Sequence, residues 1–303
     1  MNPFTFPIRC VSPALVFPKS VARFTIPTAT RCTTLSMAFS LSLFAAVCVP
    51  AAMAASASGA SAVKTEAVAY KQDTASLEGV LAYDAALNGK QPGIVLVPDW
   101  MGMTDLAKQY AEKVAKLGYV VLVADIYGKN VRPKDMKEAS TQAGIYKNDR
   151  SLMQARAKAA YDQLLKSPRV DASRVAAMGY CFGGGVALEL ARSGANLNGT
   201  VSFHGNLDTP HPEQAKNIKG QVLVQHGADD PYVTQDQVKG FMDEMRAAGV
   251  DWHLIQYGGA VHGFTNPNAG NDNSKGMAYN PKADKRSFQA MADFYQEIFA
   301  AVK

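Results

Sequence analysis

The sequence predicts an α/β protein with a mostly parallel, twisted sheet and helices on both of its faces. Short, uninterrupted apolar segments such as residues 93–97 (GIVLV) are typical of strands that are buried on both sides of a sheet. Segments with helical spacing, each of about 10 to 15 residues, separate most of these strands. This alternation favours parallel strands, because neighbouring parallel strands need a long crossover connection.

The individual elements follow one another along residues 65–303. A short antiparallel pair, residues 66–70 and 76–83, is expected first. The further strand candidates are residues 93–97, 119–124, 174–178, 199–203, 221–226 and 252–257. The helix candidates are residues 104–117, 151–165, 182–193, 234–248 and 282–302. No linker divides this stretch, so we expect a single domain.

The polar segment 129–149 interrupts the alternation of strands and helices. It contains Pro133 and lies between a predicted strand and the next long helix. Such an insertion is either solvated surface or a lid over a site. Its pattern does not choose between these two interpretations.

The first 54 residues are interpreted as a signal or targeting segment. They contain no Asp or Glu, and residues 37–54 form an apolar run that ends in Ala52-Met53-Ala54. This pattern is typical of a secretory signal with a small-residue cleavage site, so we expect a periplasmic or secreted protein. Import into an organelle is the alternative, and translation starts at Met1 or Met37. Residues 55–64 are expected to be a flexible lead-in.

The charge of the chain is concentrated in that leader. Four of the 31 basic residues and none of the 26 acidic residues lie in residues 1–54, so the remainder carries a net charge near +1. A nearly neutral domain has no long-range field that would capture a polyanion. We therefore expect no nucleic-acid partner, and no stable membrane association once the leader is removed.

The strongest local signal surrounds the single cysteine that follows the leader. Residues 179–183 (GYCFG) have the form G-x-nucleophile-x-G, in which a nucleophile lies on a tight turn between a strand and a helix. Gly179 and Gly183 would leave room for that turn, and the start of the next helix would favour the thiolate of Cys181. The competing interpretation is a glycine-rich turn that merely contains a buried cysteine.

Two later loops provide the partners that such a nucleophile needs. In this architecture the acid and then the histidine follow the nucleophile along the chain. His262 lies in a loop after the last predicted strand and is the candidate base. Asp230 is the candidate that orients it, with Asp229 as the alternative, because spacing alone does not separate adjacent carboxylates. Either aspartate could instead cap the helix that begins near Thr234.

The other histidines are expected to have ordinary roles. His253 and His226 belong to predicted strands, and His211 lies in a proline-rich loop. His204 follows a strand and is expected near the site, where it packs or contacts substrate.

The sequence does not favour a metal or a cofactor. It lacks the ligand spacings of common zinc sites and has no phosphate-binding glycine loop after a strand. The run Gly183-Gly184-Gly185 falls in a predicted helix and does not fit a dinucleotide fingerprint. We expect neither a metal nor a cofactor.

An acyl-transfer site also needs donors for the oxyanion that forms during the reaction. The backbone N–H of Phe182, the residue after the nucleophile, is one candidate. The second is expected from the loop that follows residues 93–97, and we assign it to the N–H of Trp100.

From about Val68 to its C-terminus, the sequence resembles the dienelactone hydrolase family of α/β-hydrolases. The likeness is carried by residues 125–128 (DIYG), 179–184 (GYCFGG), 226–233 (HGADDPYV), 262–264 (HGF), 278–280 (AYN) and 283–287 (ADKRS). The family pattern G-x-x-D-x-x-V falls on residues 227–233 and selects Asp230 over Asp229. The resemblance implies a Cys181, Asp230 and His262 triad that hydrolyses a lactone or ester through a thioester.

Two departures from the family concern the substrate. The family carboxylate that contacts the resting thiol is often Glu, whereas this sequence has the shorter Asp99. The arginine that binds the carboxylate of dienelactone in related enzymes is absent after His262, where residues 265–268 read TNPN. The resemblance therefore supports the reaction class rather than dienelactone itself. Tyr127 and Phe264, with Asp99 and His204, are candidates for contact with substrate or with the catalytic residues.

The sequence thus predicts a hydrolase of small carboxylic esters or lactones. The alternative hypothesis keeps the fold but makes the protein a non-catalytic ligand binder or a redox-responsive thiol protein, because an accessible thiolate is readily oxidised.

Overall fold

The structure is a computed structural model that describes residues 62–300. The predicted leader, residues 1–54, and most of the lead-in lie outside the described residues. Strand β1 begins at Val63 and pairs with Asp84 at that position. The last two residues of the predicted flexible lead-in, Val63 and Lys64, therefore belong to the sheet.

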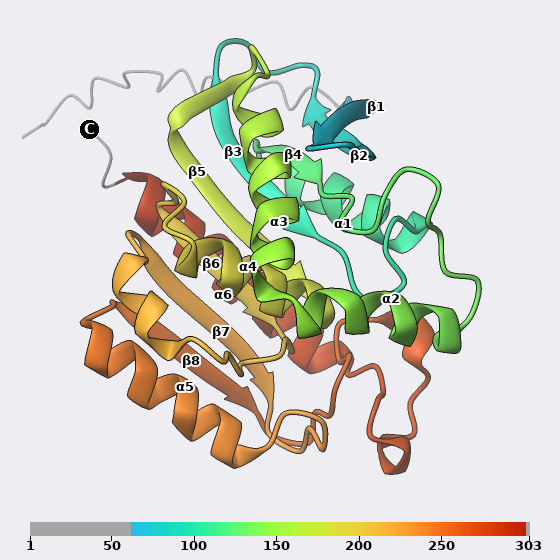
Figure 1. The fold of residues 1–303 in the computed structure, drawn as a ribbon, viewed down its shortest axis with the longest axis vertical. Coiled ribbons are helices and arrows are strands. Elements are labelled where there is room, and N and C mark those ends of the chain that lie inside the picture. Colours follow the sequence, from blue (N-terminus) through green and yellow to red (C-terminus); the bar gives the residue numbers. More distant parts are fainter. Residues whose placement is uncertain (1–61, 301–303) are drawn as a thin grey trace, which may run out of the picture. The chain divides into compact units, whose positions relative to one another are not determined.

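Within residues 62–300, eight strands form one sheet, as the sequence predicts (Figure 1). The strands are β1 (Val63–Gln72), β2 (Ala75–Asp84), β3 (Gln91–Val97), β4 (Val120–Val123), β5 (Val170–Tyr180), β6 (Gly199–Phe203), β7 (Gln221–Gly227) and β8 (Trp252–Tyr257). Their order across the sheet is β1-β2-β4-β3-β5-β6-β7-β8. Strands β1 and β2 pair antiparallel at one edge, and β3 to β8 run parallel.

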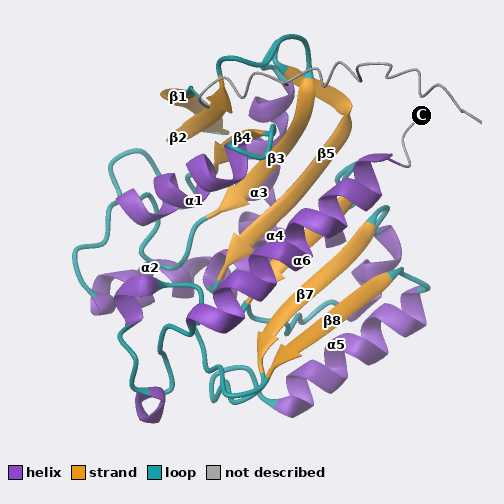
Figure 2. Ribbon diagram, turned by 180° about the vertical axis from the view of Figure 1, so that it is seen from behind, coloured by secondary structure: helices purple, strands orange, loops and turns teal. Residues whose placement is uncertain are grey.

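Helices cover both faces of this sheet. They are α1 (Asp105–Ala115), α2 (Met136–Asn148), α3 (Arg150–Leu165), α4 (Phe182–Arg192), α5 (Gln235–Ala248) and α6 (Pro281–Ala300), with short 3₁₀ turns at Pro212–Asn217, Pro267–Ala269 and Asn273–Lys275. Helices α3, α4 and α5 pack on one face, and α1 and α6 pack on the other (Figure 2). Neighbouring residues of β3, such as Val95 and Leu96, point to opposite faces, and both are fully buried. This burial explains the unbroken apolar runs of the central strands.

The carboxyl ends of the parallel strands meet at one edge of the sheet. The loops after β3, β5, β6, β7 and β8 all emerge there, at the lower end of the sheet in Figure 1. These loops carry Trp100, Cys181, His204, Asp230 and His262. Ligand sites of open α/β sheets lie at this edge.

Helix α2 occupies much of the polar segment 129–149, in which the sequence predicts no helix. Its N-cap is Asp135, whose side chain accepts a hydrogen bond from the N–H of Glu138. Its buried stripe consists of Ala139, Ala143 and Tyr146. Two alanines and one tyrosine among polar residues give only a faint apolar periodicity, which explains why the sequence does not reveal this helix.

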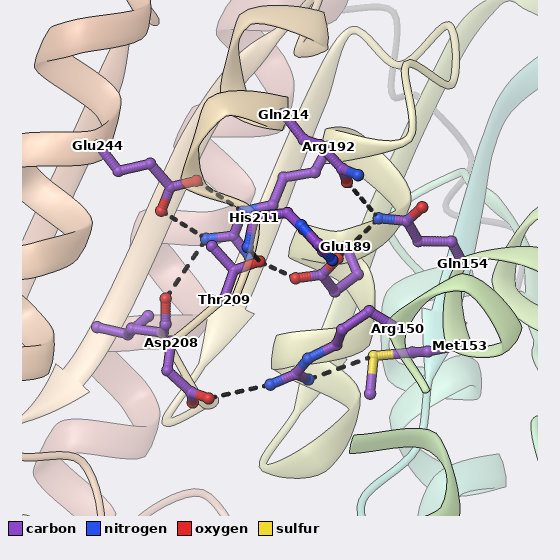
Figure 3. A network of polar contacts seen from close by, with 11 residues as sticks. Arg150, Met153, Gln154, Glu189, Arg192, Asp208, Thr209, His211, Gln214 and Glu244 are labelled. Atoms are coloured by element: carbon purple, nitrogen blue, oxygen red, sulfur yellow. Dashed lines mark hydrogen bonds and ion pairs between the residues drawn. The ribbon is translucent and has the colours of Figure 1, made fainter. Parts of the chain in front are cut away.

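A buried ion cluster ties α4 to α5 and α3 (Figure 3). Arg192, the last residue of α4, donates to both carboxylate oxygens of Glu244 in α5, at 2.7 and 2.8 Å. It also donates to Glu189 at 3.1 Å, and Gln154 of α3 donates to the second oxygen of Glu189. Arg192 and Glu189 are each only 1% exposed. Because the arginine neutralises two buried carboxylates, the helix that follows the Cys181 turn is anchored at its far end.

Replacement of Arg192 by Met should lower the free energy of unfolding by about 3 to 5 kcal/mol, because it leaves two buried carboxylates without their cation. Denaturant unfolding monitored by circular dichroism measures the change. The control is Lys158→Met, which breaks an exposed ion pair with Asp162 and should cost less than about 1 kcal/mol. Equal losses in the two variants would contradict a structural role of the buried cluster.

Candidate active site

Cys181 lies on a strained turn between β5 and α4. Its backbone angles are φ 54° and ψ −121°, a region that residues with a side chain rarely adopt. A Cβ on Gly179 would lie 2.0 Å from the carbonyl oxygen of Gly183, and a Cβ on Gly183 would lie 2.2 Å from that of Val97. The glycines two residues before and after Cys181 are therefore required by backbone contact.

The turn brings the sulfur of Cys181 to the ring of His262. The distance from Sγ to Nε2 is 3.0 Å. The other ring nitrogen of His262, Nδ1, lies 2.8 Å from Oδ2 of Asp230. Because an ionised carboxylate only accepts hydrogen bonds, this contact places a proton on Nδ1. Three side chains from three separate loops thus form one hydrogen-bonded series.

The structure separates the two neighbouring aspartates. Asp230 is buried, and its second oxygen, Oδ1, accepts hydrogen bonds from the backbone N–H groups of Tyr232 and Val233. Asp229 is exposed. Neither aspartate caps α5, because Thr234 does so with a capping box. Asp230 is therefore held with one oxygen on its own loop and the other on His262.

The electrostatics of the site favour a charged imidazole. Burial opposes protonation of His262, but the negative charge of Cys181 and the hydrogen bond to Asp230 outweigh it and raise its pKa to about 10. Burial lowers the pKa of the neighbouring His204 well below its usual value, so that ring stays neutral. The site thus holds the imidazolium of His262 next to the sulfur, while the neighbouring ring of His204 carries no charge.

The two proposed oxyanion donors come from the residue after Cys181 and from the turn after β3. Phe182 is the first residue of α4, so its N–H has no acceptor within the helix. Trp100 lies in the turn after β3, in which the N–H of Gly102 donates to the carbonyl of Asp99 at 2.9 Å. Trp100 and Cys181 line the same cavity, which places this turn beside the sulfur.

The four further candidates take different places around this site. Asp99 lines the cavity, but its Oδ1 accepts from the N–H of Met101 at 2.8 Å, and no hydrogen bond links it to Cys181 among the described residues. His204 also lines the cavity, and its Nε2 lies 2.8 Å from the hydroxyl of Thr265. Phe264 is fully buried and packs against the ring of His204. Tyr127 does not line the cavity but donates a hydrogen bond from its hydroxyl to the carbonyl of Trp100 at 2.8 Å.

The cavity above Cys181 is small and largely apolar. Its volume is about 160 Å³. Its remaining walls include Met101, Tyr110, Met136, Tyr180 and Met277. The described residues that line it include no Lys or Arg. The cavity therefore suits a small, uncharged group.

Most of this lining goes beyond what the sequence predicts. Tyr180 and Tyr110 stack with ring centroids 4.0 Å apart and form one wall. Tyr180 directly precedes the nucleophile candidate, so its place was available from the motif. Met136 and Met277 come from a helix and a loop that are distant in sequence, and no local pattern marks them.

The described part of the chain offers neither a metal site nor a membrane span. Residues 62–300 contain no group of three or more His, Cys, Asp and Glu side chains that could hold a metal ion. The same residues include no helix with the length and apolar character needed to span a membrane.

Comparison with known proteins identifies the class. The profile of the Dienelactone hydrolase family matches residues 77–299, and the chain belongs to this family. The fold is accordingly that of the α/β-hydrolases, and the chain is a hydrolase of the lactone and ester class.

Two solved structures and one further protein illustrate the similarity. The solved structure of a protein called m3DLH is 41% identical, with a TM-score of 0.76 over 78% of this chain and 99% of that one. The dienelactone hydrolase-like promiscuous phosphotriesterase P91 from metagenomic libraries is 39% identical, with a TM-score of 0.74 over 78% of this chain and 98% of that one. A protein of Bradyrhizobium sp. named "Probable 2-oxo-3-(5-oxofuran-2-ylidene)propanoate lactonase" is 27% identical over 62% of this chain and 79% of its own length.

The charge on His262 gives a prediction that does not depend on turnover. Its ring should remain protonated at neutral pH and should lose its proton only as the pH rises through about 10. Asp230→Asn removes a negative charge that favours the imidazolium, so the pKa of His262 should fall. NMR titration of labelled histidine measures both values, with the signal of the exposed His253 as internal control. An unchanged titration in Asp230→Asn would show that the carboxylate does not hold the ring charged.

Proposed function

We propose that this chain hydrolyses small, uncharged carboxylic esters or lactones, with Cys181 as nucleophile, His262 as acid and base, and Asp230 as the residue that orients His262. The observation that carries the proposal is the continuous contact from Sγ through the imidazole to the carboxylate, at 3.0 and 2.8 Å, at the wall of a small apolar cavity. This is the geometry of an activated nucleophile with an oriented base.

The reaction proceeds in two halves. The sulfur adds to the substrate carbonyl carbon, and the carbonyl oxygen takes the electron pair while the N–H groups of Trp100 and Phe182 stabilise it. The bond to the alkoxide then breaks, and Nε2 of His262 gives its proton to the leaving oxygen. Water, deprotonated by the same nitrogen, then attacks the carbonyl carbon of the resulting thioester. The C–S bond breaks, the carboxylic acid is released, and the thiolate and the protonated imidazole are restored. In a lactone the leaving hydroxyl stays attached to the acyl group.

The charge of the cavity supports an uncharged substrate. Asp99 is the acidic group of its wall besides the Cys181 and His262 pair. The imidazolium of His262 is already paired with Asp230 and Cys181, and the described lining residues include no Lys or Arg that would balance a substrate carboxylate. Burial raises the pKa of Asp99, although the Met101 N–H and His262 oppose that shift. When ionised in this buried site, Asp99 repels an anion.

The relatives support two substrate classes. The name of the Bradyrhizobium protein, a probable lactonase, supports the lactone bond, whereas the propanoate in that name is an anion and the cavity of this chain favours an uncharged lactone. The 39% identical P91, described as a promiscuous phosphotriesterase, adds phosphate triesters as a second class. A phosphate triester shares with an ester its lack of charge and an oxygen that two N–H donors can bind, so it belongs in the same assay.

Replacement of Cys181 by Ala should reduce kcat/KM for p-nitrophenyl butyrate by at least about 10³-fold, because it removes the nucleophile. A series of p-nitrophenyl esters of increasing chain length, δ-valerolactone and paraoxon, assayed on both proteins, measures the loss and the preferred class. Unchanged turnover in Cys181→Ala would end this mechanism. Absent turnover in the wild type, together with reversible oxidation of Cys181 by peroxide, would favour the redox-responsive alternative.

A matched substrate pair tests the charge of the cavity. p-Nitrophenyl butyrate and mono-p-nitrophenyl succinate are similar in length, but the second carries a carboxylate at neutral pH. We expect kcat/KM for the succinate to be lower by about tenfold or more, which corresponds to at least about 1.4 kcal/mol of repulsion and unpaired charge. A preference for the anionic ester would contradict the proposed substrate class.

A further inference from the structure

The peptide that joins Trp100 to Met101 is held at both of its polar ends. Its carbonyl oxygen, on Trp100, accepts a hydrogen bond from the hydroxyl of Tyr127 at 2.8 Å. Its N–H, on Met101, donates to Oδ1 of Asp99 at 2.8 Å. A peptide held in this way cannot rotate without losing two partly buried hydrogen bonds. The N–H of Trp100 belongs to the preceding peptide, whose carbonyl oxygen, on Asp99, accepts a hydrogen bond from the N–H of Gly102 at 2.9 Å. The two peptides meet at the Cα of Trp100, so holding one restricts the rotation of the other.

The ring of Tyr127 also contacts Gly102, in the Trp100 turn, and Phe182, which carries the second proposed donor. A Cβ added to Gly102, at the end of the same turn, would lie 3.2 Å from Cδ2 of Tyr127, so the ring lies directly against this glycine. On the other side, the rings of Tyr127 and Phe182 have centroids 5.7 Å apart. One buried side chain therefore touches the turn of the first proposed donor and the residue of the second.

We propose that Tyr127 is the positioning residue of the oxyanion hole: its hydroxyl holds the Trp100–Met101 peptide, and its ring holds the Trp100 turn at a set distance from Phe182. This inference rests on the proposed function, because it needs an oxyanion at Cys181. Tyr127 does not line the cavity, so its effect reaches the substrate only through the two backbone N–H groups.

The surroundings of Tyr127 suit this role. Burial and the negative charges of Asp99 and Cys181 raise the pKa of its phenol well above the usual value, so the hydroxyl remains a donor. Tyr146 of α2 stacks on its ring, with centroids 5.6 Å apart, and donates a hydrogen bond to its carbonyl at 3.3 Å. Helix α2 thereby supports the Trp100 turn through Tyr127, in addition to contributing Met136 to the cavity wall.

Tyr127→Phe tests the role of the hydroxyl, because it keeps the ring and removes the donor. We expect kcat/KM for p-nitrophenyl butyrate to fall about tenfold with KM nearly unchanged, since the Trp100 N–H matters most in the transition state. The inhibition constant of 1,1,1-trifluoro-2-hexanone should rise by the same factor. This ketone adds to the sulfur and forms an oxyanion, while the thiol proton stays on His262.

A second readout separates positioning from a general loss of structure. Thiol exchange of Cys181 with 2,2′-dipyridyl disulfide needs the thiolate but no oxyanion donor, so its rate should stay within about twofold of wild type. Cys181→Ala gives the background from the leader cysteines. Tyr161→Phe is the matched control, because Tyr161 is also a buried tyrosine that donates to a backbone carbonyl, that of Asn196. Its activity should be unchanged.

Several outcomes would overturn the inference. Wild-type kcat/KM and ketone inhibition in Tyr127→Phe would show that the hydroxyl does not position the donor. A parallel fall in disulfide exchange would place the loss in the thiolate instead. If Tyr127→Phe does not fold, Asp99→Ala tests the same peptide, because it removes the acceptor of the Met101 N–H. It should lower kcat/KM and weaken ketone inhibition while leaving disulfide exchange unchanged. Asp99→Asn should recover most of the activity, because its amide oxygen still accepts from Met101. Without that pattern and that recovery, the inference is wrong. Unchanged turnover in Cys181→Ala would instead overturn the proposed function itself.

Discussion

The backbone contact at the turn around Cys181 is the constraint on which the site depends. A residue with positive φ can persist between a buried strand and a buried helix only when packing on both sides holds it there. Gly179 and Gly183 permit that packing, because each approaches a backbone carbonyl more closely than a Cβ allows. The turn projects the sulfur beyond the carboxyl edge of the sheet and leaves the N–H of Phe182 without a helical acceptor. The proposed nucleophile and one proposed oxyanion donor are thus consequences of the same local geometry.

Asp230 and His262 come from two separate loops, and hydrogen bonds between charged groups connect them to each other and to Cys181. Asp230 has one oxygen committed to its own loop, so its second oxygen has a defined direction toward His262. The imidazole between a carboxylate and a sulfur carries its charge in a place where burial alone would remove it. His204, only 5.3 Å from His262 between ring centroids, stays neutral and so does not compete for that proton. Charge is therefore concentrated on one ring of the site.

The sequence predicted the sheet, the nucleophile turn and the candidate acid and base, because each has a local signature. Buried parallel strands show as short apolar runs, and the tight turn requires glycines at set positions around Cys181. The choice between Asp229 and Asp230 depended on the family resemblance, since both follow the same strand. Helix α2 and the cavity walls at Met136 and Met277 could not be predicted from local pattern. Their places depend on packing between segments distant in sequence, and α2 buries little more than two alanines and Tyr146.

Helices α4 and α2 support the two halves of the proposed oxyanion hole. Helix α4 begins at Phe182 and is anchored at its other end, where Arg192 meets Glu189 and Glu244. Helix α2 reaches the Trp100 turn through the stacked pair of Tyr146 and Tyr127. Preorganised donors stabilise an oxyanion most when they need not move as charge develops. Buried polar contacts that lie well away from the sulfur therefore bear on the chemistry proposed for Cys181, because they support the two turns that carry the proposed N–H donors.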